Sequence, residues 1–283
     1  MRNMRIFQIS TLIIASILVA TMLMSAPAYA ITNGEPDAGR HPYVCLIVCD
    51  DAPEHPAWRG TGILLSPTVV LTAGHVTDGA VAARVWFYED VTYNHVPFPL
   101  YPYGGPGSGA IEGTPHTYPG FAYGAGVGNG LPQFIHGDVG IVVLSEPVSM
   151  SEYGLLPTAG LVDTLPVMTN VDLVGYGVQY QVQPRNVVGP RGAWTGPRVR
   201  NYAPAKLLSG NFAWSNEFIR CTANPGQGGG TAFGDSGGPV LLAGTRTILA
   251  VNSYVTNANC AGETYHYRID TPEVLSWILG FCE

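Results

Sequence analysis

Short apolar runs separated by Gly, Pro and polar residues account for most of the chain beyond residue 40. The runs are rich in Val, Ile and Tyr and have turn-forming residues at their borders, which is typical of β-strands. No helical repeat of apolar positions competes with this pattern before the C-terminal end. The pattern predicts antiparallel β-structure, with strands over residues 43–49, 62–66, 68–73, 83–89, 140–145, 171–177, 239–243 and 247–255.

A single helix is predicted over residues 270–281. Thr271 is suited to the N-cap position and Pro272 to the first helical position. The apolar residues that follow recur at helical spacing and form one stripe, made of Val274, Trp277, Ile278 and Phe281. The expected architecture is therefore antiparallel β-structure with one C-terminal helix.

Residues 93–134 interrupt the strand pattern. The stretch is rich in Gly, Pro and Tyr and shows little periodicity. Connections of this length without a pattern of their own are uncommon within compact domains. We interpret it as an elaborated surface insertion, and a mobile linker is the alternative.

The first 30 residues are organised like a signal peptide. Two arginines precede an almost entirely apolar segment, residues 6–24, and small residues follow up to Ala28-Tyr29-Ala30. An uncleaved membrane anchor is the alternative, because the apolar segment approaches the length of a membrane span. We expect cleavage before Ile31, and hence a secreted, extracellular protein.

Composition narrows the function classes. Removal of residues 1–30 would leave 253 residues with 11 basic and 20 acidic side chains. An acidic balance argues against a nucleic-acid partner, whose phosphates require Lys and Arg. The 36 Gly and 23 Pro indicate many turns, and the 46% hydrophobic content indicates a folded core rather than disorder.

Three segments carry candidate chemistry. Ser236 lies in the Gly-rich segment FGDSGGPV, His75 follows an apolar run in LTAGHV, and Asp138 precedes another in HGDVGIVVL. A serine hydroxyl becomes a good nucleophile when an imidazole takes its proton, and a carboxylate fixes the tautomer of that imidazole. Ser236, His75 and Asp138 are candidates for these three roles. No metal-ligand spacing such as HExxH occurs, so we expect no metal and no cofactor.

The segments TAGHV, GDVGIVVL and GDSGGPV occur in the chain order of the chymotrypsin-like (trypsin-family) serine proteases, which this sequence resembles. ITNGEPDAG, VGYG, VNSYV and YRI extend the similarity over most of residues 31–283. The resemblance implies an all-β fold of two six-stranded antiparallel barrels. The first barrel is expected within residues 31–150 and the second, with the terminal helix, within residues 151–283.

The resemblance also implies roles for individual residues. Ser236 would be the nucleophile, His75 the general base and then the acid, and Asp138 the carboxylate that orients His75. The backbone N–H groups of Gly234 and Ser236 would form the oxyanion hole. Ser253 is expected to hydrogen bond the Asp of the triad, and the substrate backbone is expected to pair with Tyr254 and Val255 as an added strand.

A start at Ile31 has a specific meaning in the family that this chain resembles. There the new α-amine folds inward and pairs with the Asp before the catalytic Ser, here Asp235. The signal-peptide site abuts Ile31 and leaves no room for a propeptide, so the hypothesis is that export itself activates the enzyme. The rival is a mature start a few residues away, with Ile31 an ordinary strand residue.

The specificity pocket can be placed only through the resemblance. Gly230 stands where an Asp would select Arg or Lys, which argues against trypsin-like cleavage. Thr231, Val255 and Tyr265 are expected on the pocket walls. Bulky walls around an uncharged base favour small or medium uncharged side chains.

Five cysteines are present: Cys45, Cys49, Cys221, Cys260 and Cys282. In an exported chain an odd number leaves at least one of them unpaired or intermolecular. Cys45 and Cys49 lie four apart on one predicted strand, too far for a mutual bridge. Cys221 with Cys260 is the preferred disulfide, and Cys282 is left without an assignment. Two cysteines common in the family are absent, since Val76 follows the His and Ala232 lies near the pocket.

The sequence therefore predicts a secreted serine endopeptidase that works through an acyl-enzyme on Ser236. The expected partners are protein or peptide substrates and protein inhibitors. We expect a monomer with no nucleic acid, and contact with a membrane only through an uncleaved signal sequence. Two alternatives stay open: an inactive homologue that acts as a binding module, and an esterase or peptide ligase that uses the same triad.

Overall fold

The computed structural model describes residues 31, 34–92, 101–105, 107–124, 135–182, 193–195, 197–209, 216–224, 228–257 and 259–282. The predicted signal peptide and its cleavage site lie outside these residues, as do parts of the predicted insertion, residues 93–100 and 125–134. Within the described ranges, no helix is both long and apolar enough to cross a membrane.

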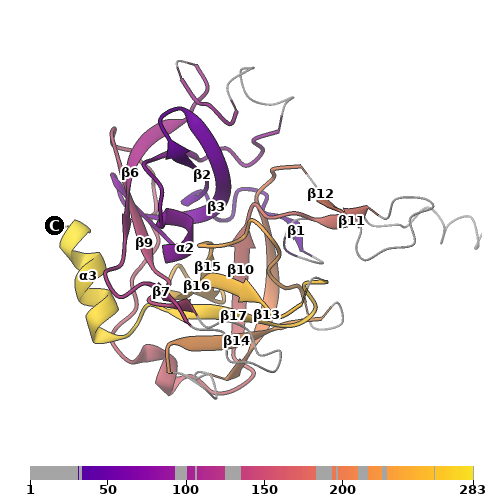
Figure 1. The fold of residues 1–283 in the computed structure, drawn as a ribbon. Coiled ribbons are helices and arrows are strands. Elements are labelled where there is room, and N and C mark those ends of the chain that lie inside the picture. Colours follow the sequence, from indigo (N-terminus) through magenta and orange to yellow (C-terminus); the bar gives the residue numbers. More distant parts are fainter. Residues whose placement is uncertain are drawn as a thin grey trace, which may run out of the picture.

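Six antiparallel strands form a first closed barrel. Its strand order is β2-β3-β4-β9-β6-β5, and β5 pairs with β2 to close it. Figure 1 shows β2, β3, β6 and β9 of this barrel. Buried Val, Ile, Leu and Trp side chains fill the barrel, which explains why its apolar runs were detectable in the sequence. The strands are β2 (Val44–Ala52), β3 (His55–Ser66), β4 (Val69–Thr72), β5 (Ala82–Trp86), β6 (Ile111–Thr117) and β9 (Gly140–Leu144).

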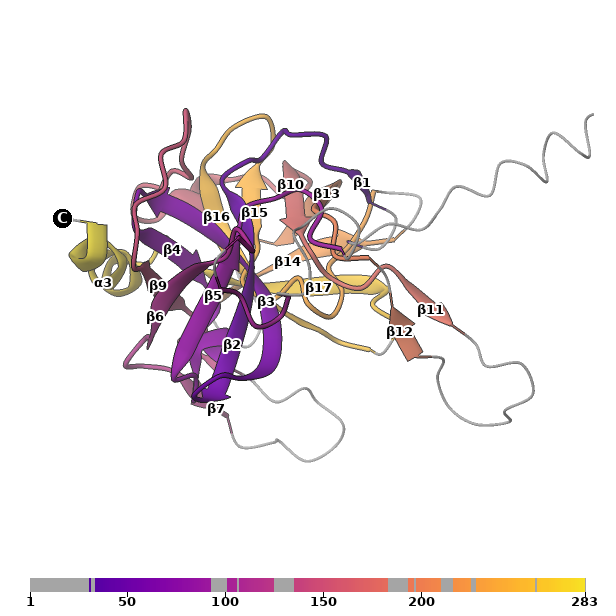
Figure 2. The same cartoon turned by 90° about the horizontal axis from the view of Figure 1, so that it is seen from above.

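A second set of six strands forms a second barrel, with the order β13-β10-β15-β16-β17-β14 and a β13–β14 pairing that closes it. The short strand β1 (Glu35–Pro36) pairs with β13, so the N-terminal segment attaches to this second barrel. Figure 2 shows the two barrels lying side by side. The strands are β10 (Asn170–Gly175), β13 (Asn201–Ser209), β14 (Phe218–Ala223), β15 (Pro239–Leu242), β16 (Ile248–Val255) and β17 (Gly262–Arg268).

The predicted fold of two six-stranded antiparallel barrels is confirmed. All eight predicted strands lie in the barrels, with ends shifted by a few residues. Among the described residues, two two-stranded sheets and one 3-10 helix lie outside the barrels. These are β7 (Ala122–Tyr123) with β8 (Ile135–His136), β11 (Tyr180–Val182) with β12 (Ala193–Thr195), and η1 (Leu161–Thr164).

The interpretation of residues 93–134 as a surface insertion is wrong for residues 111–117. These residues form β6, a full barrel strand that pairs with β5 and β9. The strand was missed because Gly113 and Pro115 disfavour β-structure and most of its side chains are only half-buried. Its pairing partners, rather than its own sequence, hold it in place.

The C-terminal helix α3 (Pro272–Cys282) is close to the predicted range and packs against the first barrel. Val274 and Ile278 are buried, as the predicted stripe requires. The Trp277 ring lies 5.3 Å from that of Tyr118, and the Phe281 ring 5.1 Å from that of His116. The end of the chain therefore fastens the second barrel to the first.

The predicted Cys221–Cys260 disulfide is wrong, since none of the five cysteines is bridged. Cys221 is buried in the core of the second barrel. Cys260 lies in the connection between β16 and β17, where its sulfur accepts a hydrogen bond from the Phe233 main chain. The two thiols occupy different environments, and burial raises the pKa of both.

A buried ion pair fixes the N-terminal segment to both barrels. Arg200 donates to Asp37 at 2.8 Å and to the Val44 carbonyl at 3.1 Å. His41 lies against the other oxygen of Asp37. Burial raises the pKa of Asp37, but the hydrogen bond from His41 and the charge of Arg200 outweigh burial and lower it.

We predict that Arg200→Met lowers the free energy of unfolding by about 3–5 kcal/mol, because it leaves the Asp37 carboxylate buried without its cation. Urea denaturation at neutral pH measures the change. The contribution from ionised Asp37 is present above the ordinary Asp pKa near 4 and is lost as the pH falls through the lowered folded value. An equal loss at pH 3 and pH 7 would contradict this account.

Candidate active site

His75 lies in the one-turn helix α2 (Gly74–Thr77), directly after β4. Its main-chain N–H donates to Asp138 at 2.8 Å, and its ring Nδ1 lies 3.0 Å from both carboxylate oxygens. A Cβ at position 74 would lie 3.0 Å from the Val139 nitrogen, so glycine lets the helix approach the Asp138 loop. The imidazole is thus oriented by two contacts with one carboxylate.

Asp138 is fully buried and lies two residues before β9. Besides His75, the Ser253 hydroxyl donates a hydrogen bond to it, as the sequence predicted. Burial raises the pKa of Asp138, but the charge and hydrogen bonds of His75 and the bond from Ser253 outweigh burial and lower it. Burial likewise lowers the pKa of His75, and the charge and hydrogen bond of Asp138 outweigh it and raise that pKa. The carboxylate is therefore ionised and favours a proton on the imidazole.

Ser236 lies in the tight turn that leads into β15, and it lines the same cavity of about 220 Å³ as the His75 ring. A Cβ at position 237, where φ is +82°, would lie 2.0 Å from the Thr72 hydroxyl oxygen. Among the described contacts, the Ser236 hydroxyl has no protein hydrogen-bond partner. The hydrogen bond between a nucleophilic hydroxyl and its base is often long in the absence of substrate and shortens when substrate binds.

Two main-chain N–H groups at this turn are free to receive a ligand. The Phe233 carbonyl accepts from Val178 N–H at 2.8 Å, and the Asp235 carbonyl accepts from Gly238 N–H at 2.9 Å. In a trans peptide the N–H points opposite to the carbonyl, so the N–H groups of Gly234 and Ser236 face away from these anchors. Neither N–H has a protein acceptor among the described residues, which fits the predicted oxyanion hole.

The Asp235 side chain is fully buried, and Asp235 is not among the lining residues of the cavity. Its carboxylate accepts from Gly177 N–H at 2.7 Å, from Ala232 N–H at 2.8 Å and from the Ile31 main chain. Ile31 is itself fully buried in the core of the second barrel. Burial raises the pKa of Asp235 to about 7, although these N–H groups favour ionisation. The structure thus brings the predicted Ile31–Asp235 pair together.

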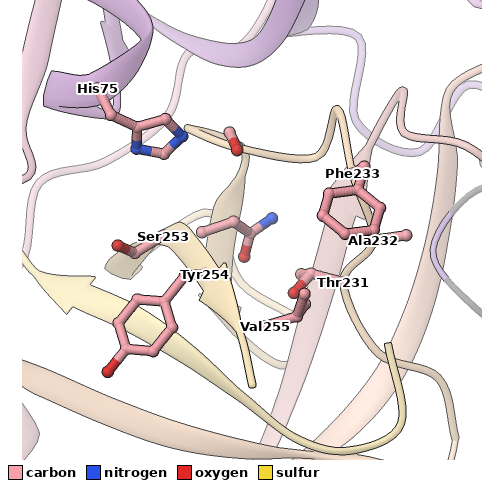
Figure 3. A pocket seen from close by; sticks show the side chains of 9 residues that line it. His75, Thr231, Ala232, Phe233, Ser253, Tyr254 and Val255 are labelled. Atoms are coloured by element: carbon pink, nitrogen blue, oxygen red, sulfur yellow. The ribbon is translucent and has the colours of Figure 1, made fainter. Parts of the chain in front are cut away.

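The cavity wall differs in part from the prediction. Thr231, Ser253, Tyr254 and Val255 line it together with His75 (Figure 3). The predicted residues Gly230 and Tyr265 are not among its lining residues. Tyr265 instead stacks on Tyr254, with the two rings 4.9 Å apart and nearly parallel. Ala232, which the sequence analysis placed near the pocket, also lines the cavity, and sequence reasoning missed two further lining residues, Phe233 and Asn252.

Thr61 was also missed, although it joins the first barrel to the Ser236 turn. Its N–H donates to the Ser236 carbonyl at 2.7 Å and its hydroxyl donates to the Gly234 carbonyl at 3.0 Å. The same hydroxyl accepts from Tyr176 N–H at 3.1 Å. A Thr within an apolar run gives only a weak signal in sequence, because its role depends on loops more than 100 residues away.

A model of the Trypsin family matches residues 127–278. No curated protein matches the chain in sequence. Among solved structures, "HL collagenase" is similar over 88% of this chain and 96% of its own, at 17% identity and a TM-score of 0.62. The Vibrio cholerae VesB protease is similar over 87% of this chain and 66% of its own, at 16% identity and a TM-score of 0.57. Human heparin binding protein is similar over 87% of this chain and 94% of its own, at 14% identity and a TM-score of 0.56. At these identities, the structural likeness shows the fold.

We predict that Gly177→Ala destabilises the protein by about 1–3 kcal/mol, because its Cβ would lie 2.5 Å from a carboxylate oxygen of Asp235. Gly280→Ala is the matched control. It lies in α3 with open space around it, and Ala should stabilise the helix by up to about 1 kcal/mol. Thermal unfolding compares the two variants, and equal effects would contradict a tightly enclosed carboxylate.

Proposed function

Because the chain belongs to the trypsin family of chymotrypsin-like serine proteases, we propose that it is a secreted serine endopeptidase. The observation that carries the proposal is the juxtaposition in one cavity of Ser236 with His75, whose ring is oriented by the buried Asp138. Family and fold together support a serine-type peptidase. The residue roles below are part of the proposal.

The proposed reaction begins when the Ser236 oxygen attacks the carbonyl carbon of the scissile bond while His75 takes the hydroxyl proton. Negative charge moves onto the carbonyl oxygen, and the N–H groups of Gly234 and Ser236 donate hydrogen bonds to this oxygen. The C–N bond then breaks as His75 returns the proton to the leaving amine. Water then attacks the carbonyl carbon of the acyl-enzyme while His75 takes a proton from it, and the ester C–O bond to Ser236 breaks as His75 gives the proton to the Ser236 oxygen. Asp138 stays ionised and stabilises the charged imidazole throughout.

The proposed substrate lies along β16 as an added strand, with Tyr254 and Val255 supplying main-chain groups. Small or medium uncharged residues are favoured before the scissile bond, since Lys, Arg, Asp and Glu are all missing from the described lining of the cavity. An inhibitor or polyanion-binding role is less well supported. Human heparin binding protein shares the fold, but this chain carries 20 acidic and 13 basic residues, which disfavours a polyanion.

The proposed activation step is removal of residues 1–30. The Ile31 nitrogen already lies at the Asp235 carboxylate while it is part of a peptide bond. Cleavage before Ile31 would convert this nitrogen into an ammonium group next to a buried carboxylate. A buried carboxylate with only neutral donors is costly, and an opposite charge offsets that cost. The pair would then hold the turn that carries Gly234 and Ser236.

A fluorophosphonate tests the nucleophile directly. We expect one covalent adduct on the secreted protein by intact-mass measurement, and none on Ser236→Ala. The labelling rate should fall as the pH drops through the raised pKa of His75, above its ordinary value near 6.5, because the charged ring cannot take a proton. A secreted protein that starts at Ile31 but gains no adduct would favour a binding module. Turnover of small esters without cleavage of any protein would favour the esterase alternative.

A one-residue N-terminal extension tests the activation step. A chain that starts at Ala30 should lose activity at least about tenfold relative to one that starts at Ile31, because no charged amine reaches Asp235. The amine has an ordinary pKa near 8, and pairing raises it. The contribution of the amine to activity is therefore complete below about pH 8 and is lost as the pH rises through the raised value, whereas the loss at lower pH belongs to His75. Equal activity of the two chains would show that Ile31 is an ordinary structural residue.

A further inference from the structure

A buried hydrogen-bond chain lies behind the cavity, and the proposed mechanism does not use it. Asn252 on β16 lines the cavity and stands opposite His266 on β17. His266 is fully buried, with Nδ1 2.9 Å from the Asn252 Oδ1 and Nε2 2.9 Å from the Thr264 hydroxyl. Polar groups are placed in a barrel core only when they are hydrogen bonded, and here each group has its partner.

The Asp235 main-chain carbonyl, at one end of this series of hydrogen bonds, determines which group donates and which accepts in each of them. The Asp235 main-chain carbonyl can only accept, so the Asn252 atom 3.1 Å from it must be Nδ2. Asn252 Oδ1 therefore faces His266 and accepts from the Nδ1–H. Burial lowers the pKa of His266 to about 3, which keeps the ring neutral, so Nε2 accepts from the Thr264 hydroxyl. The Asn252 amide cannot turn over without breaking two of these bonds.

This arrangement leaves two polar groups for a ligand. The Asn252 amide nitrogen carries two N–H groups, and the Asp235 carbonyl uses one of them. The Thr231 hydroxyl has no protein partner among the described contacts, and Figure 3 shows Thr231 among the residues that line the cavity. A hydroxyl both donates and accepts. Val255 and Ala232 supply apolar wall next to it.

We propose that Asn252, held in position by His266, makes the cavity selective for Asn or Gln as the residue before the scissile bond. This inference rests on the proposed protease function and narrows its substrate class. The substrate amide oxygen accepts from Asn252 and its amide nitrogen donates to Thr231. A carboxylate is disfavoured, because the described lining residues include no Lys or Arg and the Asn252 amide has only one N–H group that the Asp235 carbonyl does not use.

Matched peptide substrates that differ only before the scissile bond test the proposal. Asn and Leu have similar shapes, as do Gln and Met, so each pair isolates the amide group. We expect kcat/KM for Asn over Leu and for Gln over Met to be about tenfold or higher, with Asp and Glu below the amides. Equal or better cleavage after Leu and Met, or a preference for Asp and Glu, would overturn the proposal.

Two variants test whether Asn252 and Thr231 cause the preference for amide side chains. Asn252→Leu removes the donor at similar volume and should bring the Asn-to-Leu ratio close to one, and Thr231→Val should lower it severalfold. Thr245→Val, at an exposed turn outside the cavity, is the matched control and should leave the ratio unchanged. If Asn252→Leu fails to fold, the wild-type pairs and Thr231→Val still decide.

Fluorophosphonate labelling separates the two claims, because it requires Ser236 and not a particular substrate residue. A protein that labels but shows no preference for the amide substrates contradicts the specificity inference alone. A protein that neither labels nor cleaves contradicts the protease function and the specificity inference together.

Discussion

The structure of the site depends on one buried carboxylate, that of Asp235, which among the described residues receives hydrogen bonds from main-chain N–H groups, with the charge of Arg59 as a weaker influence that also favours its ionised form. The carboxylate oxygens accept hydrogen bonds from the main chain of Gly177, Ala232 and Ile31. The main-chain carbonyl of Asp235 accepts from the Gly238 N–H and from the Asn252 side chain. Ile31, the turn that carries Gly234 and Ser236, and the cavity wall therefore share a single anchor. A positive charge delivered to this anchor would stabilise all of them at once, which is why the proposed activation requires no new contact in the cavity itself.

Contacts between the barrels place the remaining groups. The first barrel contributes His75 and Asp138, and the Ser236 turn belongs to the second. Thr61 bonds the carbonyls on both sides of that turn, and the Ser253 hydroxyl reaches Asp138 from the second barrel. Each barrel thus fixes polar groups of the other. The distances that matter for chemistry are set by packing of the whole molecule rather than by any one motif.

Much of this was predictable from the sequence, for physical reasons that differ by element. Strands such as β9 and β16 have continuous apolar runs because both of their faces are buried, whereas β6 contains Gly and Pro and is held by its neighbours. The Ser, His and Asp motifs need small residues at fixed offsets, so they are visible in a single sequence. Asn252, Tyr265 and Cys260 were missed or misassigned because their roles depend on cross-strand register and on which side of the wall each side chain faces.

The central claim is that a charged Ile31 amine neutralises Asp235 in the mature protein. The most direct test is an NMR titration of the Ile31 α-nitrogen, labelled with ¹⁵N, in the active enzyme and in Asp235→Asn. We expect the amine to stay protonated well above its ordinary pKa near 8 in the wild type and to titrate near 8 in the variant. An amine that titrates near 8 in both proteins would contradict the claim.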